Sequence, residues 1–150
     1  MTTYFLDTSA LVKRYVEEAG SDTVLRLCEP AARNEIVISI LAEVELVSAI
    51  ARRVRSNELP RVEGELVHTW FKEDLAQQYE VRMLDAAVVS AATELLKAHA
   101  LRAYDAIQLA SAFVSGAARL DRKLGPVIFV TADQLLGAVS ESAGVPTLRM

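Results

Sequence analysis

The sequence contains few of the residues from which many sites and linkers are built. Cys28 is the only cysteine, which excludes an internal disulfide and a thiolate metal cage and favours a reducing, cytoplasmic location. Two histidines, His68 and His99, are too few for most histidine-based zinc sites. No run of about 18 apolar residues offers a membrane span. The N-terminus lacks the basic start and small-residue cleavage site of a signal peptide.

Positive charge is also in short supply. The 16 Lys and Arg residues are outnumbered by 20 Asp and Glu, so the net charge is -4. This argues against binding nucleic acid by bulk electrostatics, but it is compatible with a small basic patch beside an acidic site. Because cysteine and histidine are so scarce, any metal ion must be held mainly by carboxylates.

Apolar residues make up 52% of the chain and alternate between strand-like and helix-like patterns. We expect strands at 3–7, 35–40, 79–84, 126–131 and 145–150, and helices at 8–18, 21–30, 41–59, 61–79, 86–99, 103–119 and 133–143. Strands separated by helices indicate an α/β sandwich with a mainly parallel sheet. No linker, repeat or low-complexity segment divides the chain, so residues 1–150 are predicted to form one domain.

Three aspartates share one local setting. Asp7 and Asp133 each follow a strand and open a helix, and Asp105 begins another helix. Singly, each is explained as a helix cap that contributes about 1 kcal/mol. Together they suggest more, because the carboxyl ends of parallel strands meet at one edge of a sheet. Like charges held close together require a cation, and all-oxygen coordination suits Mg²⁺ or Mn²⁺.

A fourth acid is expected from the helix after the second strand. Glu43 and Glu45 are both candidates, and they point about 200° apart on a helix, so at most one faces the crevice. That helix is apolar nearly all round, so periodicity does not choose between them.

Four stretches resemble, in order and spacing, the motifs of PIN-domain nucleases, most closely the VapC-type ribonuclease toxins of bacterial and archaeal toxin–antitoxin pairs. They are "FLDTSALVKRY", "ISILAEVELVSAIARR", "YDAIQLASA" and "FVTADQLLGAV", and they cover essentially the whole chain. The resemblance implies a three-layer α/β/α sandwich that cleaves RNA with one or two Mg²⁺ or Mn²⁺ ions. It assigns the ligands to Asp7, Glu45, Asp105 and Asp133, and places the hydroxyls of Ser9 and Thr131 beside them.

Other carboxylate-based α/β enzymes fit less well. Ser9 stands where a haloacid-dehalogenase-type phosphatase has a second aspartate, and no glycine-rich phosphate loop follows the first strand. Receiver domains need an acidic pair that the sequence lacks.

The expected partners are an RNA substrate, a cognate antitoxin and a second copy of the chain. Candidate RNA contacts are Lys13, Arg14, Arg102 and Tyr104, of which the tyrosine would stack on a base. The alternative is a catalytically weak PIN-like binding module. Its interface would use the apolar stripe of residues 40–55 and the pair Trp70–Phe71.

Overall fold

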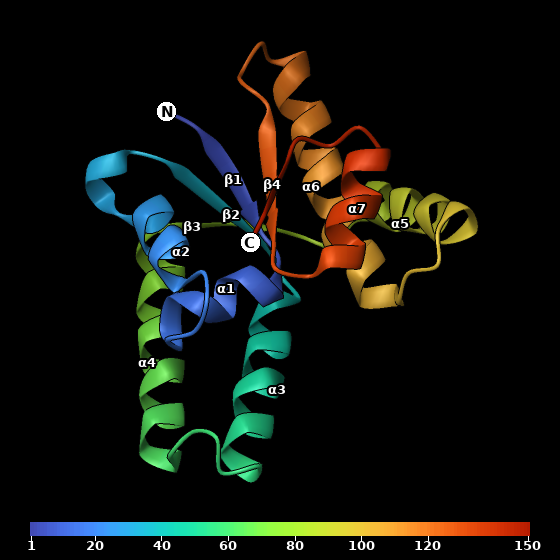
Figure 1. Cartoon of the computed structure of the whole chain (residues 1–150). Coiled ribbons are helices and arrows are strands. Elements are labelled where there is room, and N and C mark those ends of the chain that lie inside the picture. The colour runs from blue at the N-terminus through green and yellow to red at the C-terminus, as the bar shows by residue number, and fades with distance from the viewer.

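A parallel five-stranded sheet forms the centre of the computed structural model, which describes residues 1–150 (Figure 1). The strands are β1 (Thr3–Leu6), β2 (Glu35–Ser39), β3 (Tyr79–Arg82), β4 (Val127–Thr131) and β5 (Thr147–Arg149). Their order is β3-β2-β1-β4-β5, and every neighbouring pair is parallel, which confirms the predicted sheet. The chain moves outward from β1 to β3 and then returns to the other side of β1. The strand order therefore reverses between β1 and β4, where parallel sheets bind ligands.

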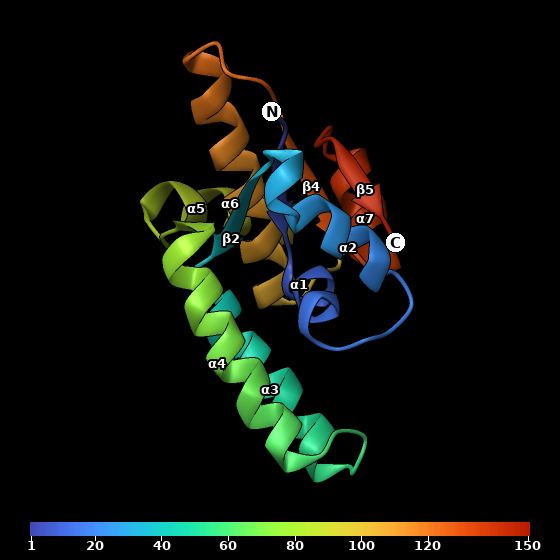
Figure 2. The ribbon, with the colours of Figure 1, turned by 90° about the vertical axis from the view of Figure 1, so that its left-hand side faces the viewer.

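Helices cover both faces of the sheet and complete the three layers (Figures 1 and 2). They are α1 (Thr8–Tyr15), α2 (Ser21–Cys28), α3 (Ala42–Arg55), α4 (Arg61–Gln77), α5 (Ala86–Ala98), α6 (Ala103–Asp121) and α7 (Gln134–Ser142), with a short 3-10 turn at Pro30–Ala32. Helices α5, α6 and α7 lie on one side, and α1, α2 and α4 on the other. Helices α3 and α4 form a hairpin that projects beyond the sheet (Figure 2). No helix combines the length and apolar character needed to cross a membrane.

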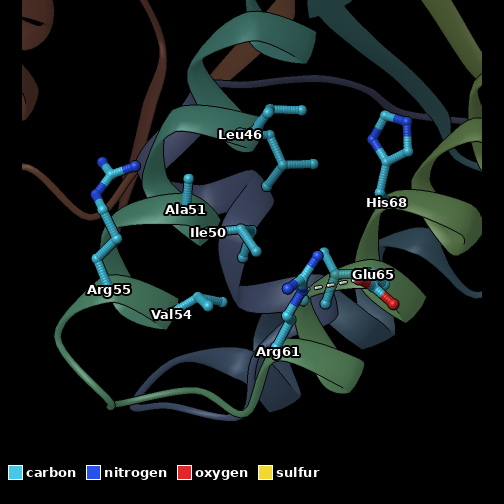
Figure 3. Close-up of a pocket in the computed structure, with 11 residues that line it drawn as sticks. Leu46, Ile50, Ala51, Val54, Arg55, Arg61, Glu65 and His68 are labelled. Atoms are coloured by element: carbon cyan, nitrogen blue, oxygen red, sulfur yellow. Dashed lines mark hydrogen bonds and ion pairs between the residues drawn. The ribbon is translucent and has the colours of Figure 1, made fainter.

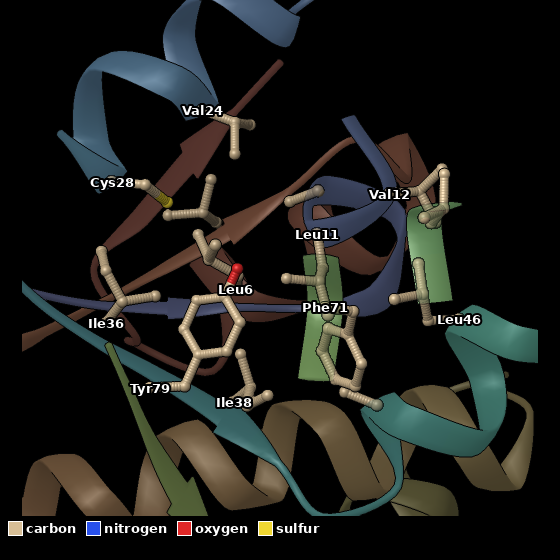
Figure 4. Close-up of a cluster of buried hydrophobic side chains, with 14 of the residues drawn as sticks. Leu6, Leu11, Val12, Val24, Cys28, Ile36, Ile38, Leu46, Phe71 and Tyr79 are labelled. Atoms are coloured by element: carbon tan, nitrogen blue, oxygen red, sulfur yellow. The ribbon is translucent and has the colours of Figure 1, made fainter. Parts of the chain in front are cut away.

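Side chains alternate between the two faces of the sheet, as strand geometry requires. Leu6 and Ile38 join a cluster with the helices on the α1 and α4 side (Figure 4), whereas Phe5 and Phe129 pack with α6 and α7. Phe71 on α4 is fully buried in the first cluster. The suggestion that Phe71 belongs to an interface is therefore wrong, because this ring fills the core.

Candidate active site

Asp7 lies at the junction of β1 and α1, in the middle of the sheet. Its carboxylate caps α1 by accepting the N–H of Ala10 at 2.8 Å, and it also accepts the hydroxyls of Ser9 at 2.6 Å and Thr131 at 2.5 Å. The residue is only 3% exposed. Burial raises its pKa to about 6, aided by the charge of Asp133 and opposed by the three hydrogen bonds. The cap and the predicted acidic site are thus the same side chain.

The hydroxyls of Ser9 and Thr131 join the loops that follow β1 and β4. Ser9 Oγ accepts the backbone N–H of Ala132 at 2.9 Å, and Thr131 Oγ1 accepts that of Asp133 at 3.0 Å. Asp133 in turn caps α7 through the N–H of Leu136 at 2.9 Å. These contacts fix the backbone of the two acid-bearing loops relative to each other.

Glu45 and Glu43 have clearly different surroundings. Glu45 lines the cleft beside Asp7, whereas Glu43 does not line it and forms an ion pair with Lys72 of α4 at 2.8 Å. Burial raises the pKa of Glu45, as does the charge of Asp105, and hydrogen bonds from Gln108 and Thr8 oppose the rise. The packing of α3 against α1 and α4 therefore makes the choice that periodicity left open.

Asp105 occupies the first turn of α6 and lines the same cleft. It accepts a hydrogen bond from Nε of Arg102 at 3.2 Å, and the Arg102 side chain is otherwise exposed. Tyr104 lies between them in the sequence, lines the same cleft and is 61% exposed. Both side chains therefore line the cleft while remaining accessible to solvent.

The four acids line one cleft with a volume of about 610 Å³. No group of three or more His, Cys, Asp or Glu side chains is arranged as a ready-made metal cage. The oxygens of Asp7, Glu45 and Asp105 instead face donors of the protein itself. The donor chemistry nevertheless fits a hard divalent cation, since every candidate ligand is a carboxylate. The charge of Asp133 helps to raise the pKa of Asp7, and the charge of Asp105 helps to raise the pKa of Glu45.

The basic residues near the cleft divide into paired and unpaired groups. Lys13 and Arg53 both line the cleft and both bind Glu18, at 3.0 and 2.7 Å. Arg52 lines it as well, is exposed and has no ion pair. Arg14, expected among the RNA contacts, does not line the cleft. Its guanidinium is held by Asp74 at 2.9 Å, because α1 turns this side chain toward α4.

Gln108 is a site residue that our sequence analysis missed. It lies on α6 one turn after Asp105, is 2% exposed, and contacts Glu45 and Thr8. The available signal was a polar residue three positions after an acid on an otherwise apolar helix face.

A second hollow lies within the α3–α4 hairpin, away from the acids (Figure 3). Its volume is about 450 Å³ and its floor includes Leu46, Ile50 and Val54. Arg55 and Arg61 lie near its opening, and Arg61 pairs with Glu65 at 3.2 Å. We call this hollow the hairpin groove.

The fold and the acidic cleft define the class of the protein: an α/β domain with a carboxylate site suited to divalent ions and phosphate chemistry. The model of the PIN-domain family, described as "PIN domain", matches residues 4–144. Ribonucleases VapC45 and VapC49 of Mycobacterium tuberculosis are each 34% identical to this chain over 117 residues, 77% of this chain and 78% of theirs. The chain thus belongs to the PIN-domain family and is a ribonuclease of the VapC type.

Solved structures share the same fold at low sequence identity. VapBC2 from Rickettsia felis, solved with a promoter DNA fragment, aligns with a TM-score of 0.66 and 16% identity over 99% of this chain and 98% of that one. VapC20 of Mycobacterium tuberculosis, a toxin that cleaves the sarcin–ricin loop, aligns with a TM-score of 0.64 and 17% identity over 98% and 99%. At these identities the likeness concerns the fold alone.

Proposed function

We propose that this ribonuclease hydrolyses RNA with Mg²⁺ or Mn²⁺ held by Asp7, Glu45, Asp105 and Asp133. The observation that carries the proposal is the meeting of four carboxylates, each from a different part of the chain, in one cleft at the carboxyl edge of the sheet. The catalytically weak binding module is less well supported, because a protein that acts only through an interface does not require four carboxylates to line one cleft.

A divalent ion bound here would supply a bound water of lowered pKa and would polarise the scissile phosphate. The chain supplies the arrangement around it. Asp7 is the central ligand, since β1 and α1 fix its backbone and the hydroxyls of Ser9 and Thr131 fix its carboxylate. Glu45 and Asp105 approach from α3 and α6, and Asp133 from the start of α7. The burial of Asp7 also limits the water that competes for its oxygens.

The RNA backbone is proposed to contact the exposed cations of the cleft. Arg52 has no competing carboxylate. Arg102 is paired only with Asp105, which is itself a proposed metal ligand. Tyr104 offers an exposed ring on which a base can stack. Lys13 and Arg53 share the single negative charge of Glu18, which holds both side chains and offsets part of their charge, so each contributes less than a free cation.

A cognate antitoxin is the proposed protein partner, and a homodimer and a cytoplasmic location complete the proposal. The Rickettsia felis structure is of VapBC2 bound to a DNA fragment from its promoter. The hairpin groove, whose lining includes Val47 with 44% of its surface exposed, provides an apolar surface for it. Arg55 beside the groove favours an apolar segment that carries acidic residues.

The two glutamates of α3 provide the test. Glu45→Gln should reduce Mn²⁺-dependent cleavage of RNA by at least a hundredfold, because it removes a charged oxygen ligand from the cleft. Glu43→Gln is the matched control and should leave most of the activity, since its carboxylate pairs with Lys72 outside the cleft. Initial cleavage rates of both variants show which of the two glutamates belongs to the site. Full activity in Glu45→Gln would refute the proposed site.

A further inference from the structure

Gln108 is a polar side chain in a place where packing alone would favour an apolar one. It is 2% exposed, and its neighbours Leu109 and Ala110 on α6 are fully buried. Its amide oxygen is buried without a hydrogen-bond partner. A buried unpaired amide oxygen destabilises the folded state, whereas an apolar side chain of similar volume avoids that penalty. Stability therefore does not account for glutamine at this position.

The amide nitrogen of Gln108 accounts for it better. Nε2 donates to Oε1 of Glu45 at 2.6 Å and to Oγ1 of Thr8 at 3.1 Å. These partners lie on α3 and at the start of α1, directly after Asp7, while α6 itself carries Asp105 one turn before Gln108. A single NH₂ group thus connects the three helices associated with Asp7, Glu45 and Asp105.

The direction of the amide is also settled by its partners. The Glu45 carboxylate only accepts hydrogen bonds when ionised, so the NH₂ group and not the amide oxygen must face it. A charge-assisted bond of this kind is short and directional, and it holds one rotamer of a glutamate that is partly exposed. Without it, Glu45 would keep only the hydrogen bond from Thr8 and would gain conformational freedom.

We infer that Gln108 is a positioning residue, which holds Glu45 in the orientation needed to bind the divalent ion and sets the spacing of the three acid-bearing helices. The inference rests on the proposed function, because it concerns the same site. Gln108 acts through Glu45 and Thr8 and is not itself assigned a contact with RNA.

The test replaces the amide by a side chain of similar volume. Gln108→Met should weaken Mn²⁺ binding, measured by calorimetry without RNA, by tenfold or more. It should lower kcat for RNA cleavage by a similar factor and leave KM within about twofold. Gln77→Met is the matched control, since Gln77 is exposed on α4 outside the cleft, and should change neither quantity. Thermal unfolding should show Gln108→Met to be as stable as the parent.

A double-mutant cycle separates positioning from a general structural effect. In the Glu45→Gln background, Gln108→Met should cause no further loss of Mn²⁺ affinity, because the side chain it positions has already been changed. Thr8→Val removes the other partner of the amide together with a hydroxyl that hydrogen-bonds Glu45, and should weaken Mn²⁺ binding more mildly, by about threefold. Gln108→Leu also lacks the amide and provides the same readout as Gln108→Met should the methionine variant fold poorly.

The outcomes distinguish the inference from the proposed function. If Gln108→Met weakens Mn²⁺ binding equally with and without the Glu45 carboxylate, or not at all, the positioning role is refuted while the acidic site stands. If Glu45→Gln itself leaves Mn²⁺ binding and cleavage intact, the proposed site fails, and the positioning role fails with it.

Discussion

The carboxyl group of Asp7 performs two tasks that conflict electrostatically. As a cap it is favoured near the start of α1, but as a buried charge it is disfavoured, and burial prevails in raising its pKa to about 6. Hydrogen bonds from Ser9, Thr131 and Ala10 reduce this effect without cancelling it. In the metal-free protein, Asp7 therefore costs stability at neutral pH, and a bound cation would remove much of that cost.

The pKa of Asp7 predicts how stability depends on pH. Its ordinary value is 3.8, so between about pH 4 and pH 6 the folded protein binds more protons at this site than the unfolded chain. The free energy of unfolding should therefore fall as pH rises through this window, by about 3 kcal/mol in total from this residue. Asp7→Asn cannot titrate and should lose that part of the pH dependence.

Denaturant unfolding in the presence of EDTA at pH 4.5 and pH 7.5 measures this difference. The free energy of unfolding of Asp7→Asn minus that of the parent should be larger at pH 7.5 than at pH 4.5. This holds even if the substitution changes stability by a constant amount at both pH values. Asp121→Asn alters an exposed acid and is the control. Parallel pH profiles for Asp7→Asn and the parent would contradict the raised pKa.

At the scale of elements, a polar network joins α1 to α4 and β3. Tyr15 donates to Asp74 at 2.7 Å and shares a hydrogen bond of 2.6 Å with Tyr79. The guanidinium of Arg14 pairs with Asp74 and lies 5.2 Å from the centre of the Tyr79 ring. This network explains why Arg14 is directed away from the cleft. It also holds α1, the helix that Asp7 caps, against the rest of the fold.

Removing the acid of this network should be costly. In Asp74→Ala the guanidinium of Arg14, whose side chain is 11% exposed, loses its carboxylate partner. We expect a loss of about 3 kcal/mol in the free energy of unfolding, because an unpaired buried charge is strongly unfavourable. Glu94→Ala breaks an exposed ion pair with Lys97 and should cost about 0.5 kcal/mol or less. Equal losses in urea titrations of the two variants would show that the network contributes no more to stability than an exposed ion pair.

At the scale of the whole molecule, an acidic protein must attract an acidic polymer. The net charge of -4 repels RNA at a distance, so attraction must come from a few local cations and from a metal ion. Of the cleft arginines, Arg52 alone has no ion pair. Few phosphate contacts imply a weak dependence of RNA affinity on salt.

This charge distribution predicts the effect of Arg52→Ala. Single-stranded RNA should bind several-fold more weakly, and the slope of log affinity against log salt concentration should become shallower by about 0.7, the value for one phosphate contact. Binding is measured in a Glu45→Gln background to prevent cleavage. Arg26→Ala, an exposed change on α2 outside the cleft, should leave the slope unchanged. An unaltered slope in Arg52→Ala would show that Arg52 does not contact a phosphate of the RNA.

Much of the fold could be predicted because its signals are local. Apolar periodicity located every strand and every α-helix, with errors of a few residues at the ends, as where α1 ends at Tyr15 and β3 at Arg82. Asp7 and Asp133 could be placed after strands because helix caps depend only on adjacent residues. Their meeting in one crevice followed from the geometry of parallel sheets.

By itself, the sequence determined the α/β architecture, the acids at the ends of the strands and the resemblance to PIN-domain ribonucleases. Only the tertiary structure decided which face of each helix meets which neighbour. It directed Glu45 into the cleft and Glu43 to Lys72, turned Arg14 toward Asp74, and buried Phe71 while leaving Trp70 exposed. It also brought Gln108 to Glu45 across 63 positions of sequence. These outcomes depend on how distant elements pack, and an evenly apolar helix carries no local pattern that encodes its rotation.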